Sequence, residues 1–126
     1  MRYTFVFGGE PQDLTIVLSG EATAAGLSRL NDDLRADDLF RAGLAILVDV
    51  SELDVSALTL DALELAAAPV VERDAAAPPR AVAIVAPDPD VLARAAHYRA
   101  FLGGSASRRR AFASTEAAVA WLREQR

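Results

Sequence analysis

The side chains that could take part in chemistry gather in one stretch, ILVDVSELDVSALTL, at residues 46–60. A carboxylate can act as a base or accept a phosphate, and a hydroxyl can receive one. The same stretch also fits a structural account, in which carboxylates cap the turn and hydroxyls cap the following helix. Both interpretations stay open for the five polar candidates, which are Asp49, Ser51, Asp54, Ser56 and Thr59.

The rest of the composition excludes several kinds of active site. There is no cysteine, so disulfides, thiolate metal sites and thiol nucleophiles are impossible. All 13 basic residues are arginine, which removes Schiff-base lysines and the GK[ST] phosphate loop. The single histidine, His97, cannot form a paired-histidine metal site. We therefore expect a protein that is not an enzyme and that needs no metal or other cofactor.

Charge and hydropathy limit the partners. A net charge of -5 opposes binding to nucleic acid, because the phosphate backbone would be repelled at long range. The run at Arg108, Arg109 and Arg110 lacks interleaved aromatic residues and is typical of a solvated edge strand. The apolar runs are too short to cross a bilayer, and the first ten residues do not resemble a secretory signal. We expect a single cytoplasmic domain over residues 1–126.

Periodicity predicts the strands. Large apolar residues alternate with threonine or valine at residues 3–7 and 14–18, which indicates two strands, and GGEPQD between them suits a hairpin loop. Residues 44–50 and 80–86 are apolar on both faces, as in central parallel strands. Residues 108–113 predict a short edge strand.

Four helices should alternate with these strands. Leu27, Leu30 and Leu34 share one face of the first helix, and Leu60 and Leu63 begin the second. Pro69 predicts a kink or break near residue 68, and DAAAPP at residues 74–79 predicts a stiff linker. Asp88 and Ser114 are the expected N-caps of the third and fourth helices. The order β β α β α β α β α predicts an α/β domain with a five-stranded mixed sheet.

Sites in open α/β sheets lie beyond the carboxyl ends of the strands. Two loops qualify, at residues 49–59 and 87–90, and Asp49 is expected to end its strand. A phospho-acceptor role for Asp49 would require a lysine, which the chain does not have. His97 lies on the flank of the third helix, where it either contacts a ligand or is a surface residue.

The order of elements, with ILVDVSELD, RAVAIVAPDPDVLARAAHYRAF and AFASTEAAVAWL, resembles the bacterial SpoIIAA-like proteins. These combine features of the anti-sigma-factor-antagonist (STAS) domain and of the SEC14 lipid-binding fold. The STAS resemblance implies a non-catalytic interaction or regulatory module, with Ser56 or Thr59 as a phosphorylated switch. The Asp-Ser-Gly context of such switches is missing from DVSELDVSALTL.

The SEC14 resemblance implies the alternative function, which is binding of a small apolar ligand or lipid. The pocket would lie between helices and sheet, and its expected residues are Leu58, Leu60, Leu63, His97, Tyr98 and Phe101. The partner is thus an unidentified protein or a small apolar ligand. A homodimer through an unpaired edge strand is compatible with either function.

Overall fold

The computed structural model describes residues 1–41, 43–75, 80–103 and 107–125. Its five strands form one mixed sheet in the order β1-β2-β3-β4-β5, in which β1 and β2 are antiparallel and all later pairs are parallel. The sheet confirms the predicted class and strand count. Its strands are β1 (Arg2–Phe7), β2 (Leu14–Glu21), β3 (Ala45–Asp54), β4 (Ala81–Val85) and β5 (Arg108–Phe112).

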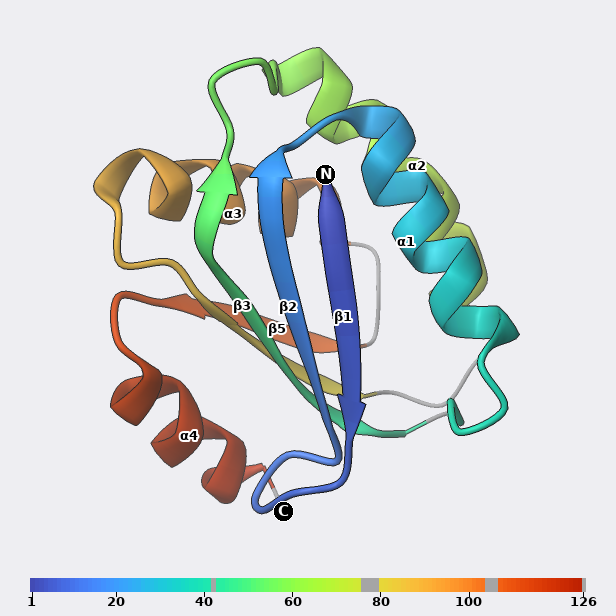
Figure 1. The fold of residues 1–126 in the computed structure, drawn as a ribbon, viewed down its shortest axis with the longest axis vertical. Helices are drawn as coiled ribbons and strands as arrows, with labels where there is room; N and C mark the ends of the chain where they lie inside the picture. Colours follow the sequence, from blue (N-terminus) through green and yellow to red (C-terminus); the bar gives the residue numbers. More distant parts are fainter. Residues whose placement is uncertain (42, 76–79, 104–106, 126) are drawn as a thin grey trace.

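Helices cover the two faces of the sheet unequally. Three of them pack over one face and bury the larger core, and the fourth packs on the other face against β3 and β4. In Figure 1, α1 and α2 run beside each other and α4 lies on the opposite side of the molecule. The helices are α1 (Ala24–Ala36), α2 (Leu60–Asp74), α3 (Pro89–Phe101) and α4 (Thr115–Glu124).

Local signals in the sequence explain where most elements begin. The side chain of Asp88 accepts hydrogen bonds from the first amides of α3, and Ser114 does the same for α4, as predicted. In the hairpin between β1 and β2, Gly8 and Gly9 have φ angles of 97° and 119°, which favour glycine. The opening antiparallel pair is therefore confirmed together with its loop.

The predicted end of β3 is wrong. The strand does not end at Asp49 but continues to Asp54, because β2 goes on pairing with it after β4 has ended opposite Asp49. The register shifts in this stretch, since Val17 pairs with Asp49 but Ser19 pairs with Glu52, so β3 holds one extra residue. The added stretch beyond Val50 is mostly exposed, so the run of apolar residues that predicts the strand ends before the strand does.

The predicted break at Pro69 is also wrong, because α2 continues through it to Asp74. Pro69 lies on the exposed face of the helix, as does Leu65 four residues earlier, whose side chain is 71% exposed. The Leu65 carbonyl that loses its amide partner can therefore bind water. The expected linker at residues 74–79 is only partly described: Asp74 ends α2, and residues 76–79 lie outside the described residues.

Candidate ligand-binding site

An apolar pocket lies between the sheet and the three helices that cover its larger core. It has a volume of about 150 Å³. Its floor includes Ile16, Val48 and Ile84 from three neighbouring strands, and Leu30 and Ala95 belong to its helical walls. The period-2 pattern of the strands and the helical stripes direct these apolar side chains toward the same space.

A few polar side chains interrupt this apolar wall, and they are Asn31, Arg80, Arg94, Tyr98 and Arg109. Burial raises the pKa of the Tyr98 phenol, and the charge of Arg109 and the neighbouring Asn31 partly oppose that rise. Asn31 also donates through Nδ2 to the Leu27 carbonyl at 3.0 Å, which orients its amide. Tyr98 is consequently a neutral, positioned phenol in the wall of the pocket.

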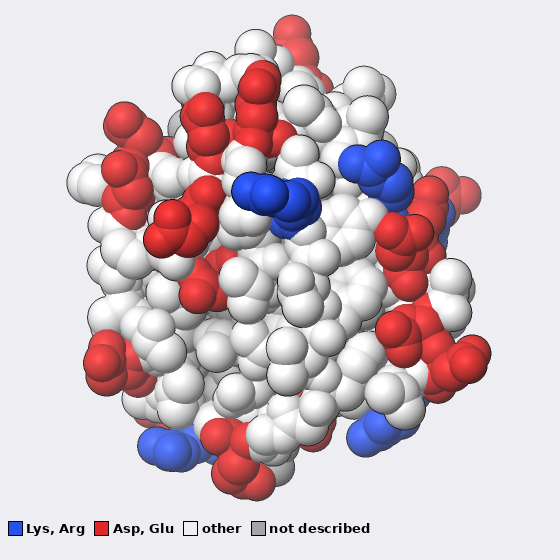
Figure 2. All heavy atoms as spheres, viewed as in Figure 1, with Lys and Arg blue, Asp and Glu red and all other residues white. Residues whose placement is uncertain are grey.

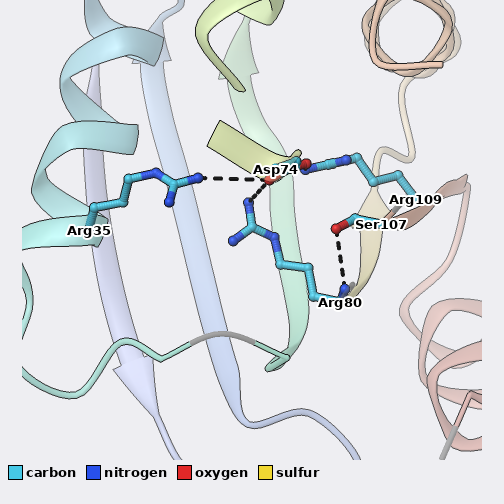
Figure 3. A network of polar contacts seen from close by, with 5 residues as sticks. All are labelled: Arg35, Asp74, Arg80, Ser107 and Arg109. Carbon is cyan, nitrogen blue, oxygen red and sulfur yellow. Dashed lines mark hydrogen bonds and ion pairs between the residues drawn. The ribbon is translucent and has the colours of Figure 1, made fainter. Parts of the chain in front are cut away.

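A buried aspartate anchors the arginines of the wall. Asp74, at the last turn of α2, has a side chain that is 2% exposed. Arg80 donates to its Oδ1 at 3.2 Å, Arg109 donates to its Oδ2 at 2.6 Å, and Arg35 lies 3.8 Å away. Figure 3 shows these side chains converging on Asp74 from different elements. We call these four residues the Asp74 cluster.

Arg80 is the least satisfied member of the Asp74 cluster. Its Nε is buried without a hydrogen-bond partner, and its guanidinium lies 5.7 Å from the centre of the Phe40 ring. Burial lowers the pKa of Arg80, Asp74 opposes that shift, and the neighbouring arginines add to it. Its backbone amide donates to the Ser107 hydroxyl, which fixes the start of β4 (Figure 3).

The predicted pocket residues divide into two groups. Leu58, Leu63 and Tyr98 line the pocket. Leu60 does not line it and is 45% exposed. Phe101 packs beside Tyr98 against Leu102, Ala67 and Val70, next to the pocket, and exposed His97 lines a separate surface hollow.

The predicted switch residues are held by local contacts. Asp49 accepts hydrogen bonds from the amide and the hydroxyl of Ser51, at 2.9 and 2.5 Å. Asp54 accepts from the Ser56 amide at 2.9 Å, and this bond is the main reason why the pKa of Asp54 is lowered. Thr59 is the N-cap of α2, with its hydroxyl oxygen accepting from the Ala62 amide.

Two of these switch residues share the hollow that contains His97. Asp54 and Ser56 lie there with Asp88, Asp90 and Arg94, at the carboxyl ends of β3 and β4. Asp49, Ser51 and Thr59 are not among its lining residues. The structure therefore brings together two of the five predicted residues and adds charged groups from α3.

The Asp74 cluster was missed by the sequence prediction, which looked only beyond the carboxyl ends of the strands. Asp74 and Arg80 flank residues 75–79, and Arg109 is the second residue of β5, so the cluster lies near the amino ends of the parallel strands. One signal was present: the middle residue of a three-residue run in a strand faces the opposite side from its neighbours. Arg109 accordingly points inward, whereas Arg108 and Arg110 are exposed.

Over the described part of the chain, no helix is long and apolar enough to cross a membrane. The same residues hold no group of three acidic or histidine side chains placed to bind a metal ion. On the face shown in Figure 2, acidic side chains and a smaller number of arginines surround a central area without charged groups. Arg80 and Arg109 of the Asp74 cluster are nearly buried within a chain of net negative charge, whereas Arg35 is 28% exposed.

Strand order and helix placement define an open mixed-sheet α/β domain with an apolar pocket beneath three helices. This is the SpoIIAA-like fold. The chain is similar to the crystal structure of an uncharacterized protein from the DUF3478 family, with a SpoIIAA-like fold, from Shewanella loihica PV-4. The TM-score is 0.60 at 16% sequence identity, over 96% of this chain and 92% of that one.

No family model and no curated protein sequence matches the chain. At 16% identity, the structural similarity establishes the fold and carries no function with it. The predicted SpoIIAA-like fold is confirmed, and the function has to be argued from the pocket and the loops.

Proposed function

We propose that the protein is a non-catalytic binding domain that takes a small apolar ligand between its sheet and helices α1, α2 and α3. The observation that carries this proposal is the pocket of about 150 Å³, which is lined mainly by aliphatic side chains and has a few polar groups in its wall. Sites for small molecules have this composition, because apolar walls supply affinity and a few polar groups fix orientation.

The volume of the pocket limits the size of the ligand. An engineered protein cavity of about 150 Å³ holds benzene, and pockets for drug-sized molecules start at about 300 Å³. A pocket of about 150 Å³ therefore suits a group the size of one aromatic ring. A complete phospholipid does not fit, so the proposal favours a small apolar ligand over a lipid.

Replacing Ala95 by leucine should abolish the binding of benzene, which is a neutral probe of the expected size. Ala95 lines the pocket from α3, and leucine is a good helix former, so the added side chain fills the space without opposing the helix. Binding is measured from methyl chemical shifts of the labelled protein during a benzene titration.

The matched control for this experiment is Ala93→Leu, because Ala93 is exposed on the same helix and does not line the pocket. We expect the control to bind benzene as the wild type does. The proposal fails if the wild type does not bind benzene, or if Ala95→Leu binds it equally well.

A second candidate function is contact with a protein partner at the hollow that holds Asp54, Ser56 and His97. The observation that favours it is the grouping of charged side chains from the end of β3, the N-cap of α3 and α3 itself around one surface hollow. We propose that such contact does not depend on phosphorylation of Ser56. A phosphate there would be repelled by Asp54, Asp88 and Asp90, which line the same hollow.

The double substitution Ser56→Glu, Thr59→Glu should leave the set of captured partners unchanged, because phosphorylation is not expected to control the contact. Affinity capture with quantitative mass spectrometry compares it with wild type. Arg94→Glu, which reverses the charge of the positive side chain in the hollow, should lose those partners. A partner that is lost or gained only with the double variant would support a phosphorylation switch instead.

A further inference from the structure

The Asp74 cluster carries more positive than negative charge. One carboxylate, Asp74, faces the guanidinium groups of Arg35, Arg80 and Arg109. The side chains of Arg80 and Arg109 are only 9% and 7% exposed, so water does little to stabilise them. Buried charges of one sign are costly unless they are paired, and here three arginines share the carboxylate of Asp74.

The pocket wall contains cationic and neutral donors but no acid. Arg80, Arg94 and Arg109 line it together with the amide of Asn31 and the phenol of Tyr98. Among the described residues that line the pocket there is no aspartate or glutamate. Asp74 binds Arg80 and Arg109 but is not itself a lining residue. An anion entering the pocket would therefore meet positive charge without a competing carboxylate in the wall.

Arg80 also has an unused donor. Its Nε is buried and has no hydrogen-bond partner, although the residue as a whole is 8% exposed. A buried donor without an acceptor is rare in folded proteins, because it loses its bond to water and gains nothing in return. An acceptor supplied by a ligand would remove this cost.

We propose that the pocket binds a small monocarboxylate whose apolar body is about the size of one aromatic ring, with its carboxylate against Arg80 and near Arg109. The proposal rests on the proposed function and names the ligand class of the same site. A guanidinium presents several N–H groups in one plane, which matches the two oxygens of a carboxylate. Most of the wall is apolar, so the compact, singly charged carboxylate fits better than a phosphate with its larger charge.

Benzoate and benzamide test the proposal, because they have nearly the same shape and differ in charge. We expect the wild type to bind benzoate about tenfold more tightly than benzamide, since hydrogen bonds between charged groups are the stronger ones. In Arg80→Met, which keeps the aliphatic stem, the two ligands should bind with equal affinity. Isothermal titration calorimetry measures both dissociation constants for each variant.

The matched control is Arg108→Met, because Arg108 is exposed on β5 and does not line the pocket. It should keep the preference for benzoate. Benzamide binding by Arg80→Met shows that the variant is folded, and if that variant does not fold, Arg109→Met takes its place with the same expected loss of preference.

The remaining outcomes would overturn either the carboxylate proposal or the proposed function. Equal binding of benzoate and benzamide by the wild type overturns the carboxylate proposal and leaves the apolar pocket in place. Tighter binding of phenyl phosphate than of benzoate overturns the choice of carboxylate. If benzene, benzamide and benzoate all fail to bind, the proposed function fails with it.

Discussion

Replacing Asp74 by asparagine should lower the free energy of unfolding by about 3–5 kcal/mol, the range seen when one partner of a buried ion pair is removed. Asparagine has nearly the same shape, so packing at the end of α2 is preserved, while the negative charge and one of the two acceptor oxygens are lost. Arg80 and Arg109, both nearly buried, would then face each other without the anion that now binds them. Urea denaturation followed by circular dichroism measures the change.

Asp32→Asn is the control for this effect. Asp32 pairs with Arg73 at 2.7 Å, but the two side chains are 57% and 37% exposed, and such surface pairs contribute about 0–1 kcal/mol. We expect Asp32→Asn to change stability far less than Asp74→Asn. Equal losses in the two variants would mean that the Asp74 cluster is solvated and does not hold buried arginine charge at the pocket wall.

The substitution Leu122→Ala should cost about 2–5 kcal/mol, as for other large-to-small changes in cores. Leu122 is 0% exposed and is one of the buried residues of the smaller core, where α4 packs against Leu47, Ala83 and Val85. That core has few large side chains, so neighbouring residues have little freedom to fill the space left by leucine. Thermal and urea unfolding measure the loss.

Leu65→Ala is the matched control, because Leu65 is exposed on α2 and its removal leaves no cavity. The pocket lies on the opposite face of the sheet from α4. The Leu122→Ala variant should therefore still bind benzene under conditions in which it is folded. Loss of benzene binding by a folded Leu122→Ala protein would show that the two faces are coupled, contrary to this account.

Local patterns were enough to predict the class, the strand order along the chain and the helix caps. Residues 44–50 and 80–86 are apolar on both parities, and both belong to the centre of the sheet. Asp88 and Ser114 cap helices as their positions predict, because a cap depends only on the next few residues.

The end of β3 and the course of α2 depend on contacts that no local pattern contains. The bulge in β3 is fixed by continued pairing with β2, a strand about thirty residues earlier in the chain. Pro69 is tolerated because tertiary packing places it on the solvent side of α2, which residue type alone does not reveal. Both features depend on tertiary contacts, which the sequence of one segment does not contain.

The polar part of the candidate site was hardest to predict. Asp74, Arg80 and Arg109 come from a helix end, a strand entry and an edge strand, and only the fold brings them together. The apolar part was partly accessible, because Leu63 and Tyr98 follow helical stripes that face the sheet. His97 is next to the lining residue Tyr98, and Leu60 is the exposed first residue of α2, so an uncertain helix rotation or start is enough to misplace them.

The central claim is that a small carboxylate occupies the pocket between the sheet and helices α1, α2 and α3. Intermolecular nuclear Overhauser effects between benzoate ring protons and labelled methyl groups test it most directly. We expect contacts to Leu30, Val48 and Ile84, which line the pocket, and none to Leu47 or Leu122 in the smaller core between α4 and the sheet. Contacts confined to the α4 side or to exposed methyl groups such as those of Leu65 would contradict the account.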